Sequence, residues 1–323
     1  MIMMPRPQLQ DVQQAASMLL GHVHRTPMLT SRKLDQLAGN TVACKSEHLQ
    51  RSGAFKFRGA YHALLRVSEV SRSSRVLTQS SGNHAQALAL AGRLLGFEVH
   101  VVMPRESPQV KREATASHGA HLYWCDAHPA DRLRVLDQVK EKTAATYVAP
   151  YDDPHIIAGA GTVALEMLEQ DPDLDALVIP VGGGGLLGGM AMAAKTLKPT
   201  IKVYGAEPSG ADDAHRSLLA GKPLPMPEPD TIADGLLTSL GEWTWPLIQH
   251  YVDHIFTVPD HAIVEAMRLL WGRMKQVVEP SGAVALAVVL SHAFKARHAG
   301  ERIGLVLSGG NVDLGFLAHD KQS

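Results

Sequence analysis

The sequence has little cysteine, almost no net charge and no uninterrupted apolar run long enough for a membrane span. Only Cys44 and Cys125 occur, without metal-type spacing, which argues against a disulfide framework and favours a reducing compartment such as the cytoplasm. The formal net charge is -1, so no basic footprint for nucleic acid or an anionic membrane is present. The uncharged run 176–194 contains Pro180 and a glycine cluster, so it predicts a strand and a helix instead of a membrane span.

The chain instead shows a regular alternation of strand and helix patterns. Its 323 residues suffice for one large domain or two medium ones. Strands are predicted at 41–44, 75–78, 98–103, 121–124, 146–148, 176–181, 202–206, 255–258 and 303–307. Helices are predicted at 9–20, 58–67, 83–95, 108–117, 130–142, 155–169, 186–197, 261–275 and 281–297. This alternation is typical of α/β folds, in which helices cover mostly parallel sheets and ligands bind at the carboxyl ends of strands.

Four segments rich in glycine or small polar residues follow predicted strands directly. They are 80–84, 182–185, 207–210 and 308–311. Because the carboxyl ends of parallel strands meet at one edge of a sheet, these segments are expected to converge on one cleft.

The glycine segment 182–185 lies between a buried strand and a helix, which predicts an anion cradle of backbone amides. No P-loop lysine follows it, so a nucleoside triphosphate site of that type is not expected. Gly183, Gly185 and Gly188 also satisfy the G-x-G-x-x-G spacing, and Glu207 ends the next strand. An NAD-dependent dehydrogenase is therefore an alternative on this segment alone. It leaves the segments around Lys56 and Ser80 without a function.

Lys56 lies between Phe55 and Phe57, in a stretch flanked by glycines. Apolar neighbours desolvate an amine and lower its pKa, which a nucleophilic lysine that forms a Schiff base requires. The alternative is an ordinary lysine whose stem crosses an apolar patch while its amine reaches water. These nine residues, 52–60, do not decide between the two.

Taken together, the segments resemble the pyridoxal-phosphate enzymes of fold type II, the tryptophan-synthase-β type. Within that group the chain is similar to the branch of serine racemases, serine/threonine dehydratases and hydroxyaspartate dehydratases. The motifs that carry the resemblance are 52–60, 80–86, 150–154, 182–185, 231–235 and 308–313. The resemblance implies two domains, each with a helix-covered, mostly parallel sheet, and an active site in the cleft between them. The large domain would comprise 1–67 and 153–323, and the small domain 68–152.

The resemblance also assigns the cofactor contacts. Lys56 would carry pyridoxal phosphate covalently, Phe55 would pack beside its ring, and Asn83 would hydrogen-bond its phenolic oxygen. Ser308 would face the pyridine nitrogen. The phosphate would be held by Gly182, Gly183, Gly184 and Gly185. A neutral serine at the ring nitrogen weakens the ring as an electron sink, which favours β-elimination over transamination.

The substrate implied by the resemblance is a β-hydroxy amino acid such as L-serine or L-threonine, converted to a 2-keto acid and ammonia. Its carboxylate would lie near Ser80, Asn83 and His84, because Asn83 and His84 open a helix. Arg132 and Ser239 match further substrate contacts. A threo-3-hydroxyaspartate dehydratase and a dedicated serine or aspartate racemase remain alternatives.

Ser81 bears on racemisation. In the racemases that the chain resembles, the second serine of this segment faces the cofactor lysine across the cofactor plane. Proton carriers on opposite faces of Cα permit racemisation, whereas elimination needs only one base. Lys56 and Ser81 together therefore predict a dehydratase with racemase activity. The alternative is that Ser81 is only a small residue before the Asn83 helix.

Glu207, Asp212 and Asp213 form an acidic group that suits a hard divalent cation. In the family resembled, the positions of Glu207, the carbonyl of Ala211 and Asp213 bind magnesium, calcium or manganese, and Asp212 is only a neighbour. The alternative is a solvated acidic loop.

The resemblance further implies a homodimer. It also implies a nucleotide effector, through the positions of Arg273 and Asn311. Neither nucleic acid nor a membrane is expected as a partner.

Overall fold

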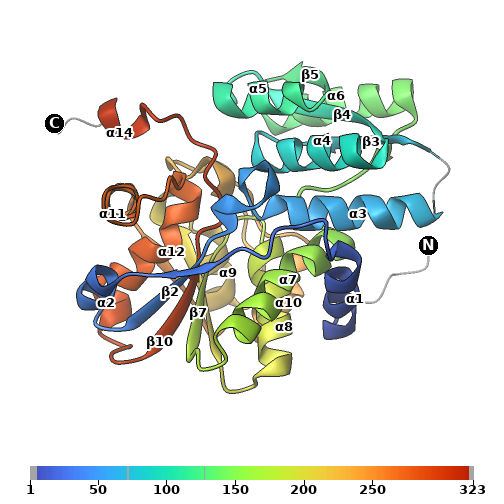
Figure 1. Ribbon diagram of the computed structural model, residues 1–323. Helices are drawn as coiled ribbons and strands as arrows, with labels where there is room; N and C mark the ends of the chain where they lie inside the picture. Colours follow the sequence, from blue (N-terminus) through green and yellow to red (C-terminus); the bar gives the residue numbers. More distant parts are fainter. Residues whose placement is uncertain (1–5, 71–72, 127, 320–323) are drawn as a thin grey trace.

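The computed structural model describes residues 6–70, 73–126 and 128–319, which form two sheets covered by helices (Figure 1). The larger sheet has six strands in the order β1-β2-β10-β7-β8-β9, and the smaller has four in the order β5-β4-β3-β6. Every pairing is parallel except that of β1 with β2. The α/β fold with two mostly parallel sheets is thereby confirmed.

Helices cover both faces of the six-stranded sheet. Its strands are β1 (Met28–Thr30), β2 (Thr41–Lys45), β7 (Ala176–Pro180), β8 (Lys202–Pro208), β9 (His254–Val258) and β10 (Arg302–Val306). Side chains alternate along a strand, so Val178 packs towards one layer of helices and Leu177 towards the other. The layer next to Leu177 contains α1 (Leu9–Leu19), α7 (Pro154–Gln170), α8 (Gly185–Leu197) and α10 (Thr244–Tyr251).

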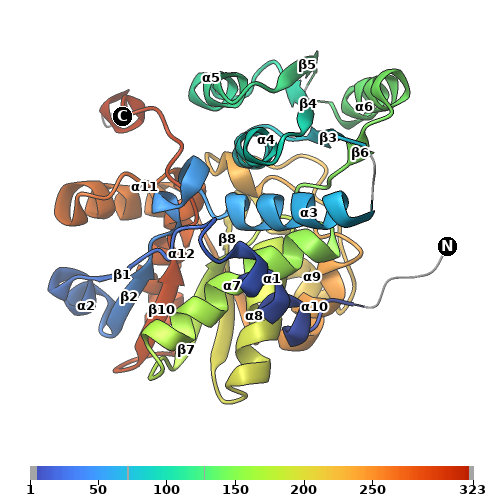
Figure 2. The same cartoon turned by 45° about the vertical axis from the view of Figure 1, so that its right-hand side comes forward.

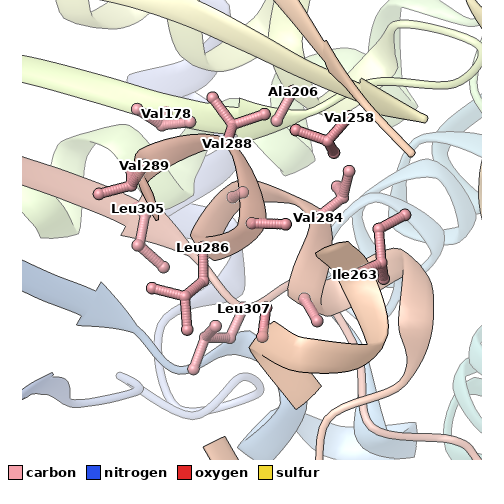
Figure 3. Close-up of a cluster of buried hydrophobic side chains, with 14 of the residues drawn as sticks. Val178, Ala206, Val258, Ile263, Val284, Leu286, Val288, Val289, Leu305 and Leu307 are labelled. Atoms are coloured by element: carbon pink, nitrogen blue, oxygen red, sulfur yellow. The ribbon is translucent and has the colours of Figure 1, made fainter. Parts of the chain in front are cut away.

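The other layer is built around α12 (Pro280–Leu290), in which all eleven residues are apolar, serine or glycine. Val284, Leu286 and Val288 of this helix are fully buried, and Figure 3 shows their side chains within a hydrophobic cluster. A helix that is apolar all round belongs inside a core. Neighbouring helices complete this layer, namely α2 (Arg32–Ala38) and α11 (Asp260–Leu269).

The four-stranded sheet lies between two sets of helices. Its strands are β3 (Arg75–Gln79), β4 (Glu98–Pro104), β5 (His121–Cys125) and β6 (Thr146–Tyr147), and its helices are α4 (Asn83–Leu95), α5 (Gln109–Ser117) and α6 (Pro129–Thr143). In Figure 2, α3 (Lys56–Val70) lies between α4 and α7 and so joins the two halves of the molecule. Figures 1 and 2 place the small sheet above α3 and the large sheet below it.

The division into domains at 67/68 and 152/153 stays a prediction. All four strands of the small sheet fall between residues 75 and 147, inside the range 68–152. The helix α3, however, continues to Val70, so a cut after residue 67 would pass through its last turn.

Two predicted helices are not continuous. The helix expected at 281–297 is interrupted at Ser291, where an extended backbone separates α12 from α13 (His292–Lys295) and the Ser291 hydroxyl accepts a hydrogen bond from the Phe294 amide. The helix expected at 261–275 changes at Leu270 into a turn of π-helix, Leu270–Met274. The strand β1 and the helices α2, α9 (Asp213–Ala220) and α10 were not predicted. Across the described residues, no helix combines the length and apolarity needed to cross a bilayer.

Candidate active site

A cavity of about 230 Å³ is lined by residues from both halves of the molecule. The half with the small sheet contributes the segment after β3, and the half with the large sheet contributes the segment after β7. The predicted site residues in its wall are Phe55, Lys56, Ser80, Ser81, Asn83, His84, Arg132, Gly182, Gly183, Gly184, Gly185 and Ser308. Segments up to about 250 residues apart in sequence thus meet at strand ends, as parallel sheets require.

Lys56 is the first residue of α3, and its amine lies in the cavity wall. The amine donates a hydrogen bond to the carbonyl oxygen of Pro150 at 2.6 Å, and it lies 5.2 Å from the centre of the Phe55 ring. Burial lowers the pKa of Lys56 to about 8. A larger fraction of this amine is therefore free to act as a nucleophile or base at neutral pH than for a solvated lysine.

The glycine segment forms a close-fitting cradle at the start of α8. A Cβ atom at Gly183 would lie 2.4 Å from the Tyr151 ring, and Gly184 has a φ of 88°, which favours glycine. Both features keep side chains out of the segment. The first amides of α8 have no acceptors within the helix, so they are available to an anion such as a phosphate.

The segment Ser80–Asn83 is shaped by hydrogen bonds and by a lysine stem. The Ser80 hydroxyl accepts hydrogen bonds from the amides of Gly82 at 3.2 Å and Ala85 at 3.3 Å. A Cβ atom at Gly82 would lie 2.3 Å from Cδ of Lys111. Burial, and after it the nearby Lys56, lowers the pKa of His84 to about 3. The imidazole is therefore neutral at physiological pH and adds no charge to the cavity.

Ser308 lies beside the Lys56 loop because the two segments are hydrogen-bonded. The Phe55 amide donates to the carbonyl oxygen of Ser308 at 3.0 Å, and Ala54 forms an isolated bridge with Gly309. The Ser308 hydroxyl is buried and donates to the Ser281 carbonyl oxygen at 3.4 Å. The Lys56 loop and the Ser308 segment, which are expected to contact opposite ends of the cofactor ring, are thus hydrogen-bonded to each other.

Three charged residues of the cavity wall were not assigned by sequence reasoning. The Lys111 amine, from α5, forms ion pairs with Asp234 at 2.5 Å and with Glu279 at 3.0 Å. Glu279 also accepts a hydrogen bond from the Asn83 amide group, whose oxygen accepts one from Asn311 at 2.9 Å. Asp234 lies in the motif 231–235, which could have indicated it. Nothing in the local sequence marks Lys111 or Glu279.

Ser239 is the one predicted substrate contact that the cavity wall does not include. Its hydroxyl accepts a hydrogen bond from the Met226 amide at 3.0 Å, while the preceding residue, Thr238, lines the cavity. The substrate role of Ser239 stays a prediction.

Glu207, Ala211 and Asp213 lie together at the end of β8. The Glu207 carboxylate accepts hydrogen bonds from the amides of Ala214 at 3.0 Å and His215 at 2.8 Å. Burial raises the pKa of Glu207 to about 8 and that of Asp213 to about 6, while Asp212 pairs with Arg216 at 2.7 Å. Two neighbouring buried carboxylates with raised pKa values fit a bound cation, which would neutralise their charge.

Metal-ligand clusters of three or more His, Cys, Asp or Glu side chains are absent from the described part of the chain. A cation at the end of β8 would therefore need the Ala211 carbonyl and waters besides the two carboxylates.

The family of proteins described as pyridoxal-phosphate dependent enzymes matches residues 19–309. The chain belongs to this family. It is 44% identical to the serine racemase of Arabidopsis thaliana over 310 residues, which are 95% of this chain and 94% of that protein.

Solved structures agree. The structure of maize serine racemase matches with a TM-score of 0.94 at 42% identity, covering 98% of this chain and 97% of that one. The crystal structure of a T.th. threonine deaminase matches with a TM-score of 0.90 at 45% identity, covering 95% of this chain and 99% of that one.

Membership of this family rules against the alternative that the glycine segment belongs to an NAD-dependent dehydrogenase. In the structure Glu207 accepts amides at the start of α9, and the glycine segment shares its cavity with Lys56. The residues present fit pyridoxal phosphate on three counts: an amine with a lowered pKa at Lys56, a cradle that side chains would fill at Gly183, and a neutral hydroxyl at Ser308.

Proposed function

We propose that this pyridoxal-phosphate enzyme converts a β-hydroxy amino acid, such as L-serine or L-threonine, to a 2-keto acid and ammonia, and that it also racemises its substrate. The observation that carries the proposal is a single cavity that is lined by Lys56, Ser81 and the glycine cradle together. The similarity to serine racemases and to a threonine deaminase supports both activities.

The phosphate and ring of the cofactor would be held by separate segments of the chain. Gly182, Gly183, Gly184 and Gly185 would donate backbone amides to the phosphate, and Lys56 would hold the cofactor covalently. Phe55, Asn83 and Ser308 would contact its ring. When bound, the cofactor supplies an electron-withdrawing ring that stabilises negative charge at Cα.

The chain's own residues then bind the substrate and move its protons. The start of α4, with Ser80, Asn83 and His84, offers amides to the substrate carboxylate. The substrate amine would first replace Lys56 on the cofactor, which frees the Lys56 amine. This amine then takes the Cα proton from one face, and the β-hydroxyl leaves with a proton as water. The resulting enamine hydrolyses to the keto acid and ammonia. For racemisation, Ser81 returns a proton to the opposite face of Cα.

A second substrate, threo-3-hydroxyaspartate, is favoured by one observation. Arg132 lines the same cavity, and its guanidinium suits a second carboxylate. A dedicated serine or aspartate racemase would use the same Lys56 and Ser81 without losing the β-substituent.

The experiment that tests the function has two arms. Borohydride treatment of the purified protein should abolish its visible absorption, and mass spectrometry should then find the cofactor on Lys56. A panel of L- and D-serine, threonine and 3-hydroxyaspartate should yield keto acid and inverted amino acid. Absence of the cofactor from Lys56, or no reaction with any β-hydroxy amino acid, would refute the proposal.

We also infer a divalent cation held by Glu207, the Ala211 carbonyl and Asp213, because their burial leaves two carboxylates that a cation would neutralise. The homodimer, the cytoplasmic location and the nucleotide effector remain predictions. For the effector, Arg273 is exposed on the π-helical turn, while Asn311 joins the Ser52 carbonyl oxygen to Asn83.

A further inference from the structure

Four charged residues behind the active site form a buried ionic cluster, the Arg58 cluster, consisting of Lys45, Glu47, Arg58 and Glu166. The side chains of Lys45, Glu47 and Arg58 have no exposed surface, and that of Glu166 is 14% exposed. Two cations face two carboxylates, so the cluster is electrically balanced. It connects the end of β2, the first turn of α3 and the second half of α7.

The Arg58 guanidinium is held in one orientation by two forked interactions. Its Nε and Nη2 donate to the two oxygens of Glu47, each at 2.8 Å. Its Nη1 and Nη2 donate to the two oxygens of Glu166 at 2.7 and 2.9 Å. The His24 carbonyl oxygen and the Thr162 hydroxyl accept the remaining bonds. A lysine keeps the charge but lacks this planar set of donors.

Lys56 and Arg58 lie on opposite sides of the first turn of α3. Two residues correspond to a rotation of ~200° about a helix axis, so the Lys56 side chain reaches the cavity while that of Arg58 reaches the ionic cluster. Upstream, the Phe55 amide ties the chain to Ser308. Downstream, Gly59 packs so closely on α7 that a Cβ atom there would lie 2.8 Å from the Ile156 carbonyl oxygen. The rotation of this turn is therefore fixed on both sides.

The cluster is not explained by stability alone. Removing four charged groups from water costs several kcal/mol for each ion, and buried ion pairs are often no more stabilising than apolar residues of the same volume. The forked bonds of Arg58 to Glu47 and Glu166 instead restrict the first turn of α3 to one orientation. The helix turn that they hold is the one that carries the amine of the active site.

We propose that Arg58 is a positioning residue for Lys56: its forked bonds to Glu47 and Glu166 fix the rotation of α3 and so aim the Lys56 amine into the cavity, where it is buried. This inference rests on the proposed function of Lys56. Burial is the cause of the lowered pKa of Lys56, so a small rotation that admits water raises that pKa. The other titratable groups in the cavity wall are His84, Lys111, Arg132, Tyr151, Asp234 and Glu279.

The experiment compares Arg58→Lys with Lys45→Met in the full-length protein. The rate at which Lys56 binds added pyridoxal phosphate is measured against pH, together with the circular dichroism of the bound cofactor, kcat and KM. For Arg58→Lys, the pH of half-maximal rate should rise by about one unit or more, towards that of a solvated lysine. Its kcat should fall ~10²-fold with little change in KM, the usual effect of a displacement of about 1 Å.

Lys45→Met is the matched control, because Lys45 belongs to the same buried cluster but not to α3. It should lower the melting temperature while leaving the pH profile of Lys56 and the dichroism per bound cofactor unchanged. Equal shifts in both variants, or no shift in Arg58→Lys, would overturn the proposal. If Arg58→Lys does not fold, Glu47→Gln, which weakens one fork at constant volume, is judged by the same criteria. Failure of the wild type to carry the cofactor on Lys56 would instead refute the proposed function.

Discussion

At the scale of single residues, the site combines an amine with a lowered pKa, a neutral imidazole and two neutral hydroxyl groups. Burial lowers the pKa of Lys56 to about 8, and burial together with Lys56 lowers that of His84 to about 3. Ser81 and Ser308 carry no charge. A base acts best when its pKa lies near the working pH, so Lys56 is suited to take a Cα proton at neutral or mildly alkaline pH.

We expect Ser81→Ala to separate the two activities. Without the hydroxyl, no second proton carrier is expected on the face opposite Lys56, so racemisation should fall by ~10²–10⁴-fold, the range typical of a general acid or base. Elimination from at least one enantiomer should persist, because Lys56 suffices for it. Chiral chromatography of the remaining substrate and a keto-acid assay measure the two rates.

The control for this variant is Ser107→Ala, which removes the hydroxyl of a buried serine shortly after the end of β4 and outside the cavity wall. It should leave both rates unchanged. Losses below tenfold in both activities of Ser81→Ala would contradict the role assigned to Ser81.

At the scale of elements, the site depends on how tightly its loops and helices approach one another. The glycine segment before α8 packs against Tyr151, and Gly82 packs against the Lys111 stem. Because these contacts leave no volume for a methyl group, the backbone itself forms this part of the cavity wall.

We expect Gly183→Ala to weaken cofactor binding. The added Cβ atom would lie 2.4 Å from the Tyr151 ring, so either the ring or the cradle must move. The loss should be at least tenfold in the dissociation constant of pyridoxal phosphate, roughly one lost charge-assisted hydrogen bond. An absorbance titration of the cofactor-free protein measures it.

Gly272→Ala is the matched control, since a Cβ atom there meets nothing within 4 Å. Its affinity for the cofactor should equal that of the wild type. If Gly183→Ala also binds with wild-type affinity, the segment 182–185 is not the phosphate cradle.

At the scale of the whole molecule, polar bridges cross between the half built on the small sheet and the half built on the large one. Lys111 of α5 reaches Asp234 and Glu279, and Asn83 of α4 reaches Glu279 and Asn311. The candidate cation site at the end of β8 lies in the large half. There the carbonyl oxygen of Gly210 accepts a hydrogen bond from the Asp230 amide at 2.8 Å, four residues before Asp234. A cation there would therefore stabilise the segments that lead to the cavity wall without taking part in the reaction itself.

We expect chelation of divalent cations to lower the melting temperature and the activity together, with magnesium, calcium or manganese restoring both. A ligand that binds only the folded state at a hundredfold excess over its Kd stabilises by about 2.7 kcal/mol. Asp213→Ala should reproduce the effect of chelation and make added metal ineffective. Differential scanning calorimetry with and without chelator measures the change.

Asp212→Ala serves as the control, because Asp212 pairs with Arg216 and is not among the expected ligands. It should keep its response to metal. An unchanged melting curve and full activity after chelation would mean that Glu207 and Asp213 do not hold a cation.

Much of the fold follows from local patterns. The helix predicted at 83–95 matches α4 because glycines flank it, at Gly82 and at Gly96 with a φ of 78°. The helix expected at 281–297 is instead broken at Ser291, whose hydroxyl accepts a hydrogen bond from the Phe294 amide and so caps a new helix, α13. Periodicity thus locates elements, and caps decide where they end.

By itself, the sequence determined the alternation of strands and helices and most of the site, because those residues lie in short motifs at strand ends, where the α/β architecture brings them together. The Ser80–Asn83 segment, the glycine cradle and Ser308 are all of this kind, whereas Lys56 lies in its own motif at the start of α3. Only the tertiary structure decided the partners of Lys111, Glu279 and the Arg58 cluster. Most of those contacts join residues far apart in the chain, such as Arg58 with Glu166 and Lys111 with Glu279. In the local sequence these charged side chains look like ordinary surface residues, and only their burial in the folded chain distinguishes them.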